Sequence, residues 1–377
     1  MTIQLPVIGS AVAALLVAAV VALITTPVVK STAIKFGAID VPKDGRRMHD
    51  HPIPRMGGLA IFFGFILSIL LFLPLSKQLR GMLLGAVIIV VLGIFDDKYA
   101  LPAMPKFCVQ IVAALIAVMM GNRIYIISNI NIFSDQPYWN LGWLSIPISV
   151  LWIVGITNAV NLIDGLDGLA CGVSTISSLT LFVIALVVAE PDVAILTAAL
   201  AGACLGFLPY NMNPAKIFMG DTGSTFLGFV LATVSIQGLF KFYTVISFAA
   251  PFLMLGLPIF DTGFAIVRRL AKGQSPMTPD RGHIHHRLID MGFSQKQAVA
   301  TLYIISAILG LSAVVLTTSG VFRAMIFFAA LCVAGALAAK FYLDRNLEEK
   351  KKQEAAKHTT PLAGNEKFFG EEDQSEK

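Results

Sequence analysis

The stretch Asn158-Ala-Val-Asn-Leu-Ile-Asp-Gly-Leu-Asp-Gly-Leu-Ala170 places two asparagines, two aspartates and two glycines between long apolar runs at 146–156 and 179–189. A carboxylate beside hydrocarbon is costly, by about 2.5–3.5 kcal/mol at the centre of a membrane helix on insertion scales. No basic residue lies near these aspartates in the sequence, so a bound cation is the group expected to compensate them. We therefore interpret Asn161, Asp164 and Asp167 as part of a metal and phosphate site at a membrane surface.

The composition around this stretch indicates a polytopic membrane protein. Of the 377 residues, 56% are hydrophobic and 14% are charged, and the mean hydropathy is +0.78. Soluble domains are about 45–50% apolar and about 25% charged. A membrane helix needs about 20 mostly apolar residues. The sequence thus predicts an all-α integral membrane protein with about eleven transmembrane helices, at 5–29, 57–75, 81–95, 104–120, 143–159, 170–189, 192–210, 224–240, 245–267, 298–317 and 322–343.

The basic residues predict the orientation of these helices. The first segment has no Lys or Arg before it, unlike a secretory signal, so we expect a retained helix with its N-terminus outside. Cytosolic loops of membrane proteins carry an excess of Lys and Arg. With the N-terminus outside, the cytosolic loops and tail hold 23 of the 28 basic residues. The predicted topology is therefore N-out and C-in.

Two regions outside the helices have their own expectations. The external loop 121–142 alternates apolar and polar residues, which is typical of a short β-hairpin. The tail 344–377 is dense in Lys and Glu and poor in apolar residues, which indicates a disordered cytosolic extension. The expected organisation is a membrane catalytic domain over 1–343, with its active-site loops on the cytosolic face, followed by this tail.

Two adjacent carboxylates, Asp96 and Asp97, end the third predicted helix on its cytosolic side. They repel each other and oppose the helix dipole, which favours cations at a C-terminus. This double penalty predicts a bound cation or a chemical role, the alternative being two solvated helix-end residues. Lys106 follows at the start of the next helix, either as a snorkelling lysine or as a phosphate contact.

The segment Phe218-Met-Gly-Asp-Thr-Gly-Ser224 places Asp221 just before a predicted helix. Backbone N–H groups at a helix N-terminus favour anions such as phosphate, and the glycines let the backbone approach a ligand closely. A simple capping role for Asp221 is the alternative. The sequence thus marks this loop as a second part of a phosphate site.

The last large loop contains Asp280-Arg-Gly-His-Ile-His-His-Arg287, with three of the six histidines. Clustered histidines suggest zinc, but the chain offers them no cysteine partner, and their expected neighbours are Asp and Arg. Imidazole and guanidinium groups together suit a pyrophosphate through charge-assisted and forked hydrogen bonds. We therefore expect this loop to contact a sugar-phosphate or pyrophosphate.

All these polar segments map to one side of the predicted membrane. A transporter of a charged solute more often has ionisable residues near the bilayer midplane. Carboxylates with water suit Mg²⁺, which uses one or two protein ligands together with substrate phosphates. Sites for phosphoryl transfer typically combine a metal ion with Arg and Lys side chains. The layout favours an enzyme at the interface that takes one substrate from the cytosol and one from the lipid.

Four motifs in order, Asp96-Asp97, 158–169, 218–224 and 280–287, resemble the signature loops of the polyprenyl-phosphate N-acetylhexosamine-1-phosphate transferases. The similar branch is that of the bacterial undecaprenyl-phosphate GlcNAc-1-phosphate transferases, which initiate teichoic acid, O-antigen or related glycans. The branch that makes peptidoglycan lipid I typically has three consecutive histidines, whereas this chain has His283-Ile-His-His286 after Arg281. The resemblance implies that UDP-GlcNAc and undecaprenyl phosphate give undecaprenyl-pyrophosphoryl-GlcNAc and UMP.

The resemblance also implies roles for individual residues. Mg²⁺, or Mn²⁺ in its place, would be held by Asp221 and Asp164 with Asn161 beside them. Asp96 or Asp97 would position or deprotonate the lipid phosphate, and Asp164 counts with them as catalytic. The remaining substrate-binding residues would be Lys106 for phosphate, Asp167 on the nucleotide side or as a structural residue, and Arg281, His283, His285 and His286 for the sugar-phosphate and pyrophosphate.

Several alternatives stay open at this point. The donor could be another UDP-HexNAc, including UDP-MurNAc-pentapeptide, and a transporter of lipid-linked or nucleotide sugars is the rival from another class. Direct attack by the lipid phosphate is favoured over a first attack by an aspartate, because that phosphate is already an anionic nucleophile. The expected location is the bacterial cytoplasmic membrane with the site facing the cytosol. A homodimer is compatible with the resemblance, and no nucleic-acid partner is expected.

Overall fold

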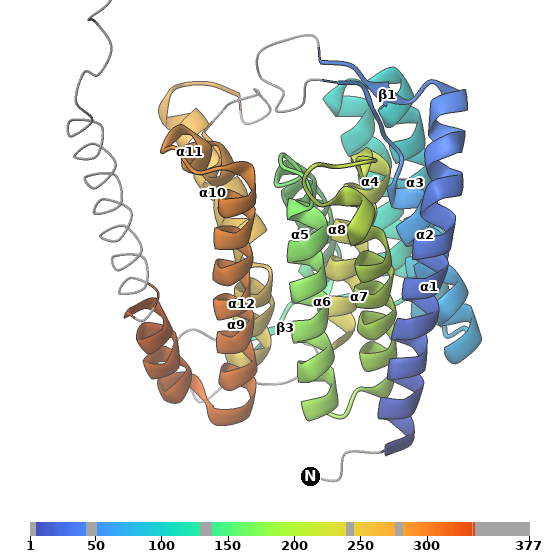
Figure 1. The fold of residues 1–377 in the computed structure, drawn as a ribbon. Helices are drawn as coiled ribbons and strands as arrows, with labels where there is room; N and C mark the ends of the chain where they lie inside the picture. Colours follow the sequence, from blue (N-terminus) through green and yellow to red (C-terminus); the bar gives the residue numbers. More distant parts are fainter. Residues whose placement is uncertain are drawn as a thin grey trace, which may run out of the picture. The chain divides into compact units, whose positions relative to one another are not determined.

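The computed structural model describes residues 5–42, 51–128, 138–238, 245–275, 282–333 and 335. The chain divides into two units, Met1–Met325 and Ile326–Lys377, and the elements α1 to α12 lie in the first (Figure 1). Within the described ranges, six helices are long and apolar enough to cross a membrane, so the chain is an integral membrane protein. They are α1 (Leu5–Phe36), α3 (Lys77–Tyr99), the 3₁₀ turn η1 (Gly142–Leu144) continued by α5 (Ser145–Leu162), α6 (Leu169–Val187), α7 (Pro191–Asn211) and α12 (Gln295–Ser319).

Shorter helices complete the described fold. They are α2 (Gly58–Phe72), α4 (Ala103–Met119), α8 (Gly220–Gly238), α9 (Val245–Met254), α10 (Gly256–Ala271), α11 (Ile284–Asp290) and an apolar helix at Val321–Val333. The expected helical membrane fold is confirmed, while the count of eleven spans and the N-out orientation stay predictions. The tail 344–377 lies outside the described residues.

One predicted span is interrupted. The continuous helix expected at 245–267 is two helices, α9 and α10, which meet at Leu255. Pro258 lies in the first turn of α10 and has no N–H to donate to the carbonyl of Met254, the last residue of α9. A proline ring also clashes with the carbonyl four residues before it, so the helical ladder stops there.

Two small antiparallel sheets lie in the loops. Strands β3 (Ile126–Ser128) and β4 (Tyr138–Asn140) form the hairpin that the sequence predicts, with Ile127 opposite Trp139. Strands β1 (Ile39–Asp40) and β2 (Ile53–Pro54) were not predicted, because each has two residues within a loop expected to be irregular. They return the chain to the start of α2.

Small residues pack α1 against α7, which lie side by side in Figure 1. Ala14, Ala18 and Ala22 of α1 are fully buried. A side chain at Gly206 of α7 would place its Cβ 2.1 Å from the carbonyl oxygen of Ala19, so only glycine permits this approach. Association of membrane helices depends on such close packing of small residues, since lipid supplies no hydrophobic drive between them.

Helix α8 is buried among its neighbours along most of its length. Phe226 and Phe229 have no exposed surface, and the ring of Phe226 meets those of Phe62 and Phe65 on α2 edge-on at 5.5 and 5.7 Å between centroids. Helices α3 and α5 pack on α8 as well. The N-terminal end of this central helix, which carries Asp221, is therefore fixed by several elements at once.

Candidate active site

The N-terminus of α8 is held by a carboxylate from α3. Asp97 accepts hydrogen bonds from Asp221 N (2.9 Å) through Oδ1 and from Thr222 N (3.1 Å) and Oγ1 (2.6 Å) through Oδ2. The first N–H groups of a helix have no partner within it, and a carboxylate there satisfies them and complements the dipole. A Cβ on Gly93 would lie 2.4 Å from Thr222 Cα, so glycine lets α3 approach this closely. Asp97 therefore fixes the place of Asp221.

Asp96, beside it, belongs to a chain of charges. Its Oδ2 accepts from Lys106 Nζ at 2.8 Å, and the same ammonium donates to Asp221 Oδ2 at 3.1 Å. Asp96 Oδ1 accepts from Leu101 N at 2.7 Å. The side chain of Asp96 is 8% exposed, while those of Lys106 and Asp221 are 27% and 28% exposed. The lysine thus compensates the charges of two acids. Within this group of three charged side chains, those of Lys106 and Asp221 are the partly exposed ones.

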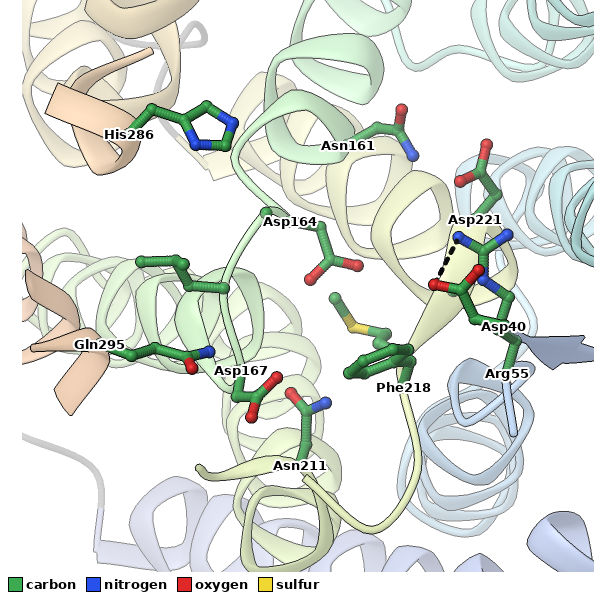
Figure 2. A pocket seen from close by; sticks show the side chains of 14 residues that line it. Asp40, Arg55, Asn161, Asp164, Asp167, Asn211, Phe218, Asp221, His286 and Gln295 are labelled. Carbon is green, nitrogen blue, oxygen red and sulfur yellow. Dashed lines mark ion pairs between the residues drawn. The ribbon is translucent and has the colours of Figure 1, made fainter. Parts of the chain in front are cut away.

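A cavity of about 330 Å³ opens in front of Asp221 (Figure 2). Asp164 and Asp167 line it from the turn between α5 and α6, and Asp40 lines it from β1. Burial, followed by the neighbouring charges of Asp221 and Asp97, raises the pKa of Asp164 to about 8. The cavity wall is therefore crowded with carboxylates, as the opening stretch of sequence predicts.

Hydrogen bonds tie this turn to its surroundings. Asn161, at the end of α5, donates from Nδ2 to Ser224 Oγ on α8 at 2.8 Å. Asp167 Oδ2 accepts from Asn213 Nδ2 at 2.9 Å and from Ala215 N at 3.0 Å. The resemblance implied either a nucleotide-side role or a structural role for Asp167. These hydrogen bonds are structural contacts, and Asp167 also lines the cavity.

Arg55 is a cavity residue to which the sequence assigned no role. The backbone around it pairs with the segment before α8, because Phe218 N donates to Pro54 O and Gly57 N donates to Phe218 O, both at 2.9 Å. Its guanidinium lies 3.9 Å from the Asp40 carboxylate (Figure 2), and its Nε is buried without a hydrogen-bond partner among the described residues. In the sequence Arg55 is one of several basic residues in a loop whose positive charge sets the membrane topology. Nothing in the sequence distinguishes it from these other residues.

The cavity also has an aromatic ring and amides in its lining. Phe218 and Asn211 line it, together with Gln295 from the start of α12. Asn211 is 2% exposed and donates from Nδ2 to Ile217 O at 3.1 Å. Its buried Oδ1 has no hydrogen-bond partner within the described part of the chain, which leaves an acceptor for a ligand. Aromatic and amide side chains are common near membranes, so their types alone gave no signal.

The three histidines of 283–286 have three different places. His286 lines the cavity (Figure 2). His285 is 3% exposed, and a Cβ on Gly165 would lie 2.3 Å from its Nε2, so its ring packs directly on the turn that carries Asp164. Burial and the neighbouring His286 lower the pKa of His285 to about 4, which keeps it neutral. His283 is buried and pairs with Asp261 of α10. Arg281 lies outside the described residues.

The donor set suits Mg²⁺. Asp164 and Asp221 both face the cavity, and Mg²⁺ is typically bound by one or two carboxylates plus substrate phosphates and water. Among the described residues no group of three or more His, Cys, Asp or Glu could hold an ion alone. A metal completed by the substrate fits these residues better than a caged structural metal.

Fold and cavity together define a multi-pass membrane protein with an acid-rich site suited to a phosphate-bearing ligand. The family model described as Glycosyl transferase family 4 matches residues 79–239. The chain is 45% identical over 315 residues to a probable undecaprenyl-phosphate N-acetylglucosaminyl 1-phosphate transferase of Bacillus subtilis, covering 83% of this chain and 87% of the relative. The chain therefore belongs to glycosyl transferase family 4, which confirms the resemblance carried by its motifs.

Two further relatives align with this chain over most of their own length. A decaprenyl-phosphate N-acetylglucosaminephosphotransferase of Mycolicibacterium smegmatis is 37% identical, over 77% of this chain and 78% of the relative. A phospho-N-acetylmuramoyl-pentapeptide-transferase of Staphylococcus aureus is 32% identical, over 78% of this chain and 96% of the relative. Both kinds of sugar donor in these names thus occur among similar proteins.

Proposed function

We propose that this protein transfers GlcNAc-1-phosphate from UDP-GlcNAc to undecaprenyl phosphate, giving undecaprenyl-pyrophosphoryl-GlcNAc and UMP. The relative of that name shares 45% identity over 83% of this chain. The observation in the structure that carries the proposal is the cavity that Asp164, Asp221 and Arg55 line together. Acids for a divalent cation beside a fixed cation suit a pyrophosphate, which needs charge neutralisation more than covalent help.

The donor pyrophosphate would lie at the acidic end of the cavity. Asp221 and Asp164 would hold Mg²⁺, or Mn²⁺ in its place, with Asn161 beside them. When bound, the ion neutralises phosphate charge. Arg55, whose Nε is buried and unpaired among the described residues, would donate to phosphate oxygens while Asp40 holds its guanidinium. His286 would contact the same group from the opposite wall.

The nucleoside would lie against the part of the cavity that Phe218, Asn211 and Asp167 line. A planar base suits the ring face of Phe218, since bases stack on aromatic side chains. The Oδ1 of Asn211, which has no partner in the described ranges, would accept from one of the base's N–H groups. Asp167 would face the nucleotide with the carboxylate oxygen that the loop at 213–215 leaves available.

The lipid phosphate would meet Lys106. This ammonium lies between Asp96 and Asp221, at the partly exposed end of the acid chain. An oxygen of the lipid phosphate would attack the sugar-bearing phosphorus directly. A new P–O bond forms while the bond to UMP breaks, and the electron pair leaves with UMP. We assign the acceptor side to Asp96 and the capping of α8 to Asp97, because the latter's oxygens already accept three hydrogen bonds.

The proposal includes the membrane arrangement. We propose about eleven spans with the N-terminus outside, a site facing the cytosol of a bacterial cytoplasmic membrane, a catalytic domain at 1–343 with a cytosolic tail at 344–377, and a possible homodimer. The concentration of 23 of the 28 basic residues on one predicted side supports this orientation.

The test is a transfer assay with purified protein in detergent. UDP-[³H]GlcNAc and undecaprenyl phosphate should give a butanol-soluble product and an equal amount of UMP, and product formation should require the lipid. UMP release without the lipid, or no labelled lipid at all, would contradict the proposal. Movement of substrate across vesicles without UMP formation would support the transporter alternative instead.

The donor sugar needs its own comparison, since one similar protein is named for a MurNAc-pentapeptide donor. Unlabelled UDP-GlcNAc should compete with the labelled donor far better than UDP-MurNAc-pentapeptide does. The reverse order would assign the chain to the second activity.

A further inference from the structure

Helix α10 carries a buried acid that is separate from the cavity wall. Asp261 is 3% exposed and shares the inner face of α10 with the buried Ala265 and Arg269. Its Oδ2 lies 2.8 Å from His283 Nδ1, and its Oδ1 accepts from Ile284 N at 2.8 Å. Both oxygens thus point at the segment that begins α11. About two turns further along α10, the guanidinium of Arg268 packs on Gly282.

The contact between Asp261 and His283 determines which ring nitrogen of His283 carries a proton. An ionised carboxylate only accepts hydrogen bonds, so His283 must carry its proton on Nδ1. The other ring nitrogen, Nε2, is then the acceptor when the ring is neutral. With Ile284 N on its second oxygen, the carboxylate also fixes the position of the ring relative to the backbone. The carboxylate therefore sets both the tautomer and the orientation.

Three rings in contact lead from this pair to the cavity. The rings of His283 and His285 lie 5.7 Å apart between centroids at an interplanar angle of 13°, and those of His285 and His286 lie 4.3 Å apart at 44°. His285 presses on Gly165, and His286 lines the cavity beside the same turn. A shift of His283 would therefore reach the residue next to Asp164.

We propose that Asp261 is a positioning residue for the transfer reaction, fixing the tautomer and place of His283 and, through the ring contacts of His285, the place of His286 and the Asp164–Gly165 turn. The proposal rests on the proposed function for its activity readout. Carboxylates that orient functional imidazoles have effects disproportionate to their distance from the reacting atoms. Asp261 touches neither the cavity nor, in this account, the substrate.

The test compares Asp261→Asn with Asp290→Asn, an exposed acid on α11. If the Asn oxygen still accepts from Ile284 N, its NH2 group faces His283 Nδ1, which favours the other tautomer. With the tautomer reversed, kcat/KM should fall about 10- to 100-fold, the loss seen when carboxylates that orient metal-bound imidazoles are removed. Asp290→Asn should match the parent protein. In the background of His283→Gln, adding Asp261→Asn should cause no further loss, because the acid acts through that histidine.

A second measurement separates positioning from general stability. In a long-range ¹H–¹⁵N spectrum of histidine-labelled protein, the His283 signals, assigned by their absence in His283→Gln, should show the proton on Nδ1, and Asp261→Asn should move it to Nε2. Parent-like activity of Asp261→Asn, independent effects of the two substitutions, or an Nε2 proton in the parent protein would each overturn the inference. A parent protein without transfer activity would instead sink the proposed function, while the tautomer test would still stand.

Discussion

The two walls of the cavity are held in different ways. The acid wall consists of Asp164 and Asp221, which line the cavity, and of Asp96, Asp97 and Lys106 beside Asp221. It is bonded to helix main chain, since Asp97 by itself accepts from two backbone N–H groups of α8. The histidine wall consists of His286, which lines the cavity, and of His285 and His283 behind it, and it rests on one buried carboxylate and on ring packing. Loss of the main-chain contacts that Asp97 makes should therefore cost stability as well as activity, whereas damage to the histidine wall should mostly displace side chains.

The largest effect should come from Asp221→Asn, which removes a charge that faces the cavity without removing the cap of α8. Loss of a group that stabilises charge at the reacting centre costs about 10²–10³-fold in rate, so transfer should fall at least this far. Thermal unfolding in detergent should be unchanged. The matched control is Asp192→Asn, an exposed acid in the first turn of α7, which should keep full activity. Full activity of Asp221→Asn would remove this residue from the site.

Removal of the metal tests the same wall without a mutation. EDTA should stop UMP release, and Mg²⁺ or Mn²⁺ should restore it, because the clustered carboxylates of Asp164 and Asp221 need a cation to receive a pyrophosphate. The readout is initial velocity before and after the metal is added back. Turnover that continues in EDTA would refute the metal-assisted account.

Asp97→Asn should lower both stability and activity. The NH2 group of the new amide must face N–H or O–H donors at the start of α8, which leaves a buried group without a hydrogen bond at a cost of about 1–3 kcal/mol. The melting temperature should fall together with transfer activity, in contrast to Asp221→Asn. A stable but inactive Asp97→Asn would favour a chemical role for Asp97, as the sequence first suggested.

Gly165→Ala should have the smallest of these effects and tests the histidine wall. The new Cβ would lie 2.3 Å from His285 Nε2, and this buried ring must move. Overpacking typically costs about 1–3 kcal/mol. Activity should fall and should recover in part when His285→Ala makes room. The control is Gly155→Ala on α5, where a Cβ meets nothing within 4 Å. Equal effects at the two glycines would break the link between His285 and the turn.

The sequence singled out the acids of the acid wall for a physical reason. Charges are rare in so apolar a chain, so Asp96, Asp97, Asp164 and Asp221 stand out against their surroundings, and the structure places the four near one another, while their roles stay a prediction. The difference between Asp96 and Asp97 was not predictable. Adjacent residues on a helix point about 100° apart, so one meets Lys106 and the other meets α8.

The histidine wall was predicted only as a cluster. The separate places of His283, His285 and His286 depend on the short helix α11, and the partner of His283 is 22 residues away in sequence. Asp261 was missed although it is a carboxylate inside a predicted span, a signal that often marks function. The helices themselves were predictable from apolar length, but the break at Leu255 depends on where Pro258 falls in the hydrogen-bond ladder.

The backbone pairing of 54–58 with 218–219 has a consequence for biosynthesis. Gly57 N and Gly58 N donate to Phe218 O and Met219 O, so the first loop finds its partners only after α7 has been made. Pairing between such distant segments closes a long loop at an entropic cost, which local contacts must first offset. A ribosome-bound chain that stops short of Phe218 should therefore present the residues around Arg55 without their partners at 218–219, open to a protease that the finished protein resists.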